Sequence, residues 1–180
     1  MINIITAALL ILFAAFSRLL PHPENFAPVA AAAIFAGLYM NKKYALIIPV
    51  AATFLSDIFL GLYPYVLWVY GTYLLIALIN IGLKNRYDNQ SGFKKAGLLY
   101  GATLFSSVIF FLVTNFGVWV SGLYYEMSFN GLMTSYIAAL PFFRTSLLAD
   151  VVYITLMAGV YSLVIKMLKQ PVLQESKVTK

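Results

Sequence analysis

The sequence predicts an all-α integral membrane protein, a bundle of about six transmembrane helices. Of its 180 residues, 62% are hydrophobic and 10% are charged, a balance that a soluble domain cannot hide inside its core. Polar interruptions divide the chain into apolar runs, most of them close to the roughly 20 residues that a helix needs to cross a bilayer. Lysines and arginines fall on alternate connections between these runs, as the positive-inside rule requires. Lipid is therefore the expected solvent of most of the chain.

Six apolar runs support this helix count. They are predicted at residues 2–20, 26–40, 44–62, 66–83, 95–120 and 142–168. The second run is short for a span, at about 22 Å, and the prolines that crowd its start lead us to expect a mouth that bends inward. Residues 131–140 are too few to cross and precede Pro141, which predicts a re-entrant or interfacial piece. A five-span count stays open.

The basic residues give the bundle an orientation. They follow the second run, the fourth run and the last run, whereas the other connections carry Glu24 and Glu126 and no lysine. Both termini are therefore predicted to be cytoplasmic, and the loops at 21–25, 63–65 and 122–130 are predicted to face outside. Residues 1–169 form a single transmembrane domain, and 170–180 form a cytoplasmic polar tail that we expect to be disordered.

Missing residues and motifs argue against several functions. There is no cysteine and only one histidine, which argues against disulfides, thiolate chemistry and a metal site. No phosphate-binding loop, His-Glu-x-x-His or Gly-x-Ser-x-Gly motif occurs. The basic residues are spread over short loops and not gathered into a nucleic-acid-binding patch. We therefore expect no enzyme activity, no cofactor and no nucleic-acid partner.

Four ionisable residues fall inside or at the edge of the predicted spans. They are Arg18, Asp57, Arg144 and Asp150. A charge inside the membrane is costly unless it is paired or hydrated, so each is a candidate functional residue. Both carboxylates are expected about 8 to 9 Å below the outer boundary, with the arginines above them. The four could form structural pairs that lock the bundle, or they could line an outward-facing polar cavity, and the arginines could equally reach to the interface without a ligand.

Two other segments add polar and aromatic candidates at the same side. Three prolines in residues 20–28 make a stiff turn that would present His22 and Asn25 in a fixed geometry, although Asn25 could instead cap the second helix. Near the outer end of the fifth run, Asn115 could contact a ligand or bond across helices as packing. Trp119 could stack on a flat ligand or simply belong to the aromatic belt of the interface.

These segments together resemble a known group of proteins. The residues that carry the resemblance are Arg18-Leu19-Leu20-Pro21-His22-Pro23, Asn25-Phe26-Ala27-Pro28, Ser56-Asp57, Thr114-Asn115-Phe116-Gly117-Val118-Trp119, and Pro141-Phe142-Phe143-Arg144 with Asp150. Over nearly all its length the chain resembles an uncharacterised family of small bacterial integral-membrane proteins. That family is usually grouped with the substrate-binding S components of energy-coupling-factor (ECF) transporters.

The resemblance implies a function and partners. S components capture a vitamin or similar micronutrient on the outer side of the bacterial inner (cytoplasmic) membrane and topple to release it. Their energy comes from a partner transmembrane subunit and two ATPases. They usually present an alanine-x-x-x-alanine stripe on the first helix, whereas the clearest match here, Ala32 with Ala36, lies on the second run.

We therefore predict a substrate-capturing membrane subunit of a bacterial uptake system. Its pocket would be bounded by Arg18, His22, Asn25, Asp57, Asn115, Trp119, Arg144 and Asp150. The arginines would attract an anionic group, the amides and carboxylates would orient polar edges, and Trp119 would cover an apolar face. Two alternatives stay open: a self-sufficient proton-coupled transporter using Asp57 or Asp150, and a non-transport scaffold with structural ion pairs.

Overall fold

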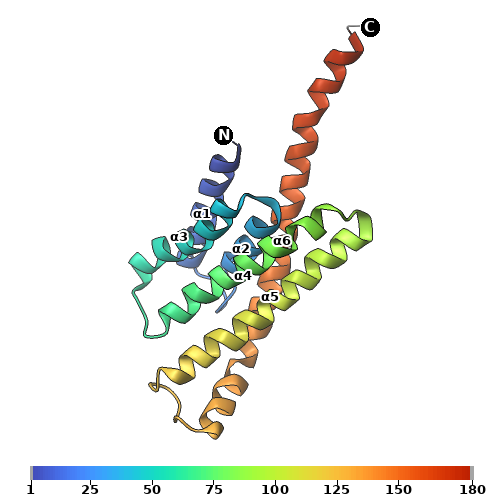
Figure 1. The fold of residues 1–180 in the computed structure, drawn as a ribbon. Helices are drawn as coiled ribbons and strands as arrows, with labels where there is room; N and C mark the ends of the chain where they lie inside the picture. Colours follow the sequence, from blue (N-terminus) through green and yellow to red (C-terminus); the bar gives the residue numbers. More distant parts are fainter. Residues whose placement is uncertain (1, 179–180) are drawn as a thin grey trace.

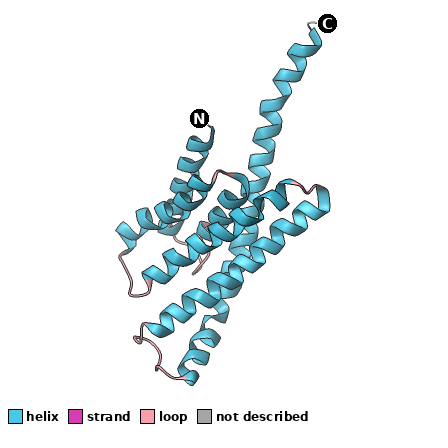
Figure 2. Cartoon of the chain, in the orientation of Figure 1, coloured by secondary structure: helices cyan, strands magenta, loops and turns pink. Residues whose placement is uncertain are grey.

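The computed structural model describes the backbone of residues 2–178 and the side chains of residues 4–168. Within that range the chain is helical with connecting loops and has no strand (Figure 2). The helices are α1 (Ile2–Leu19), α2 (Val29–Tyr39), α3 (Lys42–Leu60), α4 (Val66–Asp88), α5 (Gly92–Val120) and α6 (Phe129–Val178). This confirms the predicted all-α bundle.

Successive helices run in opposite directions, so the connections alternate between the two ends of the bundle. The loops at 20–28, 61–65 and 121–128 lie toward one end, which is the lower end in Figure 1. The N-terminal end of α1 and the connections at 40–41 and 89–91 lie toward the other, with the C-terminal end of α6 beyond them. The first set, called the loop end below, holds the connections that carry no lysine.

Helix α2 forms the centre of the bundle. It packs against each of the other helices, and every residue from Val29 to Leu38 is buried. Its consecutive alanines let neighbouring backbones approach closely. The helix is about 16 Å long, shorter than the hydrocarbon layer is thick. The predicted span at 26–40 thus contains a helix of residues 29–39 only. Because protein and not lipid surrounds this helix, it can be shorter than a lipid-exposed span and still connect the two ends of the bundle.

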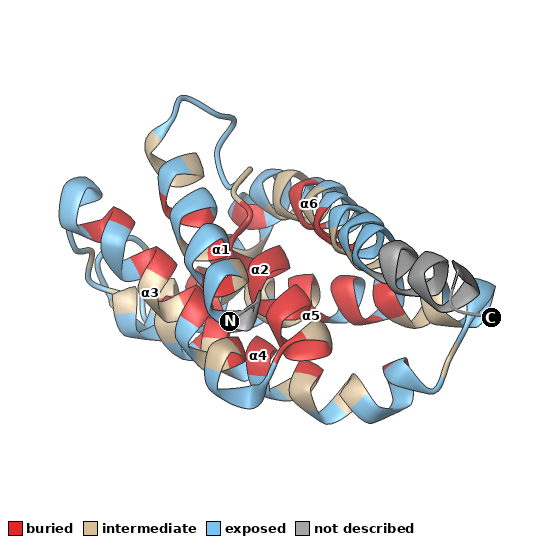
Figure 3. Ribbon diagram, turned by 90° about the horizontal axis from the view of Figure 1, so that it is seen from above, coloured by how far each residue is buried: buried red, intermediate tan, exposed pale blue. Residues whose placement is uncertain are grey.

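The surrounding helices have the composition of membrane spans. Helices α3, α4, α5 and the part of α6 up to Leu168 are each long and apolar enough to cross a bilayer, whereas α1 and α2 are apolar but shorter. Their buried residues face the interior and their exposed residues face outward (Figure 3). Much of the exposed surface consists of large apolar side chains, such as Leu67 at 81% and Phe59 at 76% exposure. Water is a poor solvent for such a surface and lipid is a good one.

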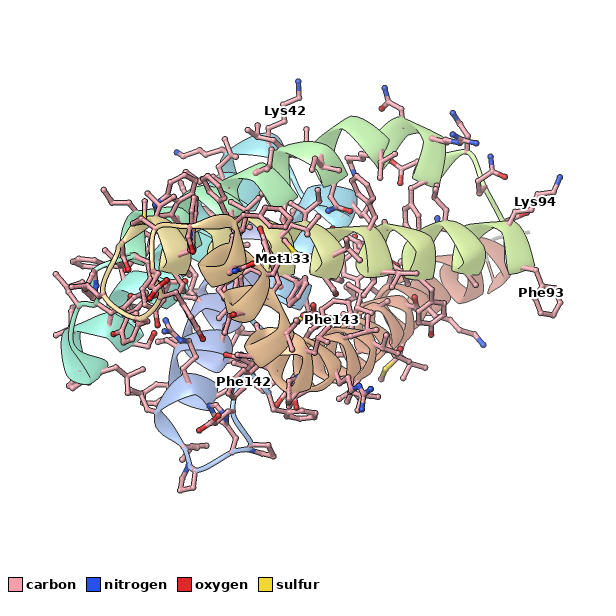
Figure 4. All side chains as sticks on the ribbon, turned by 90° about the horizontal axis from the view of Figure 1, so that it is seen from below. Lys42, Phe93, Lys94, Met133, Phe142 and Phe143 are labelled. Atoms are coloured by element: carbon pink, nitrogen blue, oxygen red, sulfur yellow. The ribbon has the colours of Figure 1, made fainter. Side chains whose placement is uncertain are left out.

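Helix α6 differs from the prediction at both ends. Residues 131–140 are not a separate re-entrant piece but the first turns of α6, which continues through Pro141. The helix changes direction near Phe142 and Phe143 (Figure 4), as expected where a proline removes a backbone hydrogen bond. At the other end the helix continues to Val178, past the predicted end of the transmembrane domain at residue 169. Leu, Lys, Gln and Glu in this tail are good helix formers.

Candidate functional site

A cavity of about 560 Å³ lies at the loop end of the bundle. All six helices and the three loops of that end contribute to its wall. Apart from four tyrosines, the polar side chains among its lining residues are Arg18, His22, Glu24, Asn25, Ser107, Thr114, Asn115, Ser135, Ser146 and Asp150. Because His22, Glu24 and Asn25 are solvent-exposed, the cavity reaches the surface at this end.

Arg18, at the end of α1, is held by α3. Its Nη2 lies 2.9 Å from Asp57 Oδ1, and its Nη1 donates to Ser56 Oγ at 2.7 Å and to the Thr53 carbonyl at 3.3 Å. Tyr70 of α4 donates its hydroxyl to the other oxygen of Asp57 at 3.0 Å. The Asp57 side chain is 1% exposed and the Arg18 side chain 16%. The predicted structural pairing of charges is therefore present for these two residues.

Tyrosines from the loops border the same region. Tyr63 and Tyr65 pack against each other with ring centroids 4.8 Å apart, and Tyr65 contacts Tyr124 edge-on. Burial of the Tyr63 hydroxyl, followed by the negative charge of Asp57, raises the pKa of Tyr63 to about 12. The Tyr63 hydroxyl therefore stays protonated at neutral pH, where it is a neutral hydrogen-bonding group and not a charge.

Asp150 has a different environment, in the middle of the bundle. It is 3% exposed, and Ser107 of α5 donates its hydroxyl to Asp150 Oδ2 at 2.7 Å. The backbone of Ala31, in the first turn of α2, lies near this carboxylate. That turn has free N–H groups, because its N-cap is Pro28 and no side chain caps it. The negative charge of Asp150 therefore lies beside the N-terminal end of α2, where the helix dipole favours it.

No cation pairs with Asp150 among the side chains that the structure describes. The salt bridges found there are Arg18 with Asp57 and Lys84 with Asp88. Arg144, six residues before Asp150 on α6, is exposed and does not line the cavity. The hypothesis that each buried carboxylate pairs with an arginine therefore holds for Asp57 and fails for Asp150.

The structure brings together five of the eight predicted site residues. Those lining the cavity are Arg18, His22, Asn25, Asn115 and Asp150. Asp57 lies directly behind Arg18. Trp119 is not in the lining, because its indole N–H donates to the Glu126 carbonyl at 2.9 Å and so ties α5 to the following loop. Arg144 is also outside the lining, so the three residues that do not line the cavity are Asp57, Trp119 and Arg144.

Some predicted roles of these residues change with their contacts. Asn25 does not cap α2, since the N-cap position is Pro28. Its backbone has a φ of 59°, in the left-handed region that asparagine tolerates better than most residues. Asn115 donates to the Phe111 carbonyl of its own helix at 2.7 Å, so its amide is not used in bonding across helices. Its carbonyl oxygen is left for another partner.

The prediction missed the aromatic wall and the serine that holds Asp150. Tyr73 of α4 stacks on Phe110 of α5 with centroids 5.1 Å apart, and Phe111 packs against Phe143 of α6 at 4.9 Å. All four rings line the cavity. Ser107 carried a usable signal, because Thr103 and Ser107 are one turn apart on one face of an apolar helix. The sequence held no signal that marked these aromatic residues as part of a site, since phenylalanine and tyrosine are common throughout this chain.

Comparisons with known proteins show a family but no function. Neither the curated proteins nor the solved structures include a match to this chain. Residues 1–173 match the family described as "Family of unknown function (DUF6580)". Because the match covers nearly the whole chain, the protein belongs to DUF6580.

Proposed function

We propose that this protein binds a small organic molecule in the cavity at the loop end and serves as the substrate-capturing membrane subunit of a bacterial uptake system. The observation that carries the proposal is the cavity itself. Its volume, about 560 Å³, falls within the range of roughly 300 to 1,000 Å³ typical of small-molecule sites. Its wall combines aromatic rings with a few polar groups, the usual composition of such sites.

The direction of capture follows from the charge distribution. The loop end carries Glu24 and Glu126, whereas Lys42, Lys43 and Lys94 lie in the first turns of α3 and α5 at the other end. The positive-inside rule then places the loop end outside the cytoplasm and the cavity mouth toward incoming solutes. In this arrangement both termini are cytoplasmic.

The partners in this proposal come from the resemblance to S components. A transmembrane coupling subunit and two ATPases would supply the energy, since the chain has no phosphate-binding loop of its own. The apolar outer surface offers contact area for such a subunit within the bilayer. Co-purification from the host membrane with an ATPase would support this part of the proposal, and uptake by vesicles that contain this chain alone would contradict it.

One observation favours a second candidate function, a self-sufficient proton-coupled transporter. Asp150 is a buried carboxylate that faces the cavity without a paired cation, whereas Asp57 is held by Arg18. A carboxylate of that kind can carry a proton across a transport cycle. Uptake into vesicles that contain this chain alone, abolished by an uncoupler and by Asp150→Asn, would establish the second function over the first.

Native mass spectrometry tests the common premise that the cavity holds a ligand. Protein purified from its host in mild detergent should retain a small molecule, and adding that compound to ligand-free protein should raise the unfolding temperature. A structural scaffold would show neither effect. If no molecule is retained and no extract fraction stabilises the protein, the binding function is refuted.

A further inference from the structure

We infer that the ligand of this cavity is an organic cation, an amphipathic molecule whose protonated or quaternary nitrogen binds at Asp150. The inference rests on the proposed binding function and specifies the chemical class of the substrate. It reverses the expectation from the sequence alone, that arginines at the site would attract an anionic group.

The first step of the argument is the charge balance of the cavity wall. Four residues of the lining have side chains that are charged or can become so near neutral pH: Arg18, His22, Glu24 and Asp150. The Arg18 guanidinium is taken up by Asp57, Ser56 and the Thr53 carbonyl. The charge of Arg18 is therefore neutralised within the protein, and Arg144 lies outside the cavity. No arginine of the cavity wall is therefore free to bind an anionic ligand.

The second step is the position of Asp150. It is 97% buried by its accessible surface yet belongs to the cavity wall, so one side of it meets the space that a ligand would fill. Its neighbours Ser107 and Ala31 are neutral hydrogen-bonding groups. A buried carboxylate with neutral donors gains most from a positive charge that the ligand brings, because that charge supplies the missing counter-ion in a medium of low polarity.

The third step is the aromatic wall. Tyr73 stacks on Phe110, and Phe111 packs on Phe143, so rings from α4, α5 and α6 line the space around the carboxylate. The negative faces of aromatic rings attract cations, and their apolar area attracts the carbon skeleton of the same molecule. A carboxylate and an aromatic wall together are suited to an amine attached to a flat or apolar body.

A bare metal ion fits this site less well than an organic cation. Within the described part of the chain, no group of three or more histidine, aspartate or glutamate side chains could hold a metal. A hard cation also needs six or more oxygen ligands, whereas aromatic and aliphatic side chains form a large part of this wall. The size of the cavity, about 560 Å³, leaves room for a molecule far larger than an ion.

The test compares three compounds of one shape and different charge. Tyramine carries an ammonium, tyrosol a hydroxyl at the same position, and 3-(4-hydroxyphenyl)propionate a carboxylate. Binding to the purified full chain in detergent is measured by the shift in unfolding temperature and by tryptophan fluorescence. We expect tyramine to bind at least tenfold more tightly than tyrosol, and the propionate to bind most weakly of the three. Equal binding of all three, or a preference for the propionate, would overturn the inference while leaving the binding function intact.

Variants of the full chain test whether the charge of Asp150 causes the preference for tyramine. Asp150→Asn should remove the preference for tyramine over tyrosol, and Ser107→Ala should weaken tyramine binding while leaving tyrosol unchanged. Asp88→Asn removes an exposed carboxylate at the opposite end of the bundle and is the matched control, expected to change nothing. If Asp150→Asn does not fold, Ser107→Ala and the comparison of the three compounds on the unmodified chain still decide the question.

The molecule retained from the host provides an independent readout. A retained compound with an amine or quaternary nitrogen supports the inference. A retained organic anion overturns it but supports the binding function. If no molecule is retained and none of the three compounds binds, both the inference and the proposed function fail.

Discussion

Arg18 and Asp57 form an ion pair between α1 and α3, with Arg18 Nη2 2.9 Å from Asp57 Oδ1. The two residues are separated in the chain by the whole of α2, so the pair joins α1 directly to α3 at the loop end of the bundle. The same guanidinium bonds Ser56 and the Thr53 carbonyl, which fixes the orientation of its planar fork. This arrangement connects the cavity wall to the stability of the fold.

Removing one partner of this pair should destabilise the protein. In Asp57→Asn, the guanidinium of Arg18 would keep its charge in a mostly buried position without a counter-ion, at a cost of about 3 to 5 kcal/mol. Arg18→Lys should also destabilise, because an ammonium cannot reproduce the forked contacts. The unfolding temperature of ligand-free protein in detergent is the measurement.

The matched control for the ion pair is Asp88→Asn. It breaks the pair of Lys84 with Asp88, whose side chains are 31% and 53% exposed, and should cost less than about 0.5 kcal/mol. If both asparagine variants lowered the unfolding temperature equally, the Arg18 pair would have no special structural role.

Gly37 is predicted to be essential for the contact of α2 with α4. A Cβ at this position would lie 2.6 Å from Asn80 Cβ, closer than such atoms can approach, and at a tight 3.1 Å from the Ala77 carbonyl oxygen. Gly37→Ala should therefore push the helices apart and cost about 1 to 3 kcal/mol, measured as a fall in unfolding temperature.

Gly82→Ala, on α4, is the matched control for Gly37. Nothing lies within 4 Å of the added Cβ, so this change should be neutral or stabilise by up to about 1 kcal/mol, because alanine favours a helix over glycine. A neutral Gly37→Ala would show that α2 and α4 are not in the close contact described.

The fold could be predicted from the sequence to the extent that lipid imposes it. Helices exposed to hydrocarbon must be apolar and of membrane length, and both properties are visible in a linear pattern. Helix α2 and residues 131–140 escape this rule. The first is surrounded by protein, and the second continues through Pro141, since neighbouring helices in a membrane bundle can compensate for a proline.

The candidate site could be predicted only in part, for a geometric reason. Arg18 and Asp57 were expected at one end of the bundle, and they meet there. Arg144 and Asp150 were expected to converge too, but six residues along a helix place two side chains about 120° apart around its axis. Asp150 faces Ser107 in the interior, so Arg144 is turned away. The depth of a residue in the membrane follows from its position in the sequence. The direction in which its side chain points depends on how the helices pack against one another.

The orientation of the protein in its membrane can be tested by labelling. The natural sequence has no cysteine, so each introduced cysteine is unique. A membrane-impermeant maleimide added to intact cells should label Leu123→Cys, in the loop between α5 and α6, because that loop is expected outside. Asn89→Cys, at the end of α4, should be labelled only after permeabilisation. The reverse result would place the cavity mouth in the cytoplasm and contradict capture from outside.

Asn25 allows a backbone role to be separated from a ligand contact. Its φ of 59° is a conformation that costs most residues roughly 1 to 2 kcal/mol and a β-branched residue more, whereas glycine adopts it freely. Asn25→Val should therefore lower the unfolding temperature, and Asn25→Gly should leave it within about 0.5 kcal/mol of the unmodified chain. Glu24→Val, at the neighbouring exposed position without a positive φ, is the control for adding an apolar side chain.

The glycine variant then reveals whether the Asn25 amide contacts a ligand. Because Asn25 lines the cavity and Asn25→Gly preserves the backbone, a loss of affinity for the retained host molecule without a loss of stability would assign the amide to binding. If Asn25→Gly binds as the unmodified chain does while Asn25→Val is destabilised, the residue serves the turn alone. The rigid turn of three prolines would then position His22 and Glu24 at the cavity mouth without contributing a contact through Asn25.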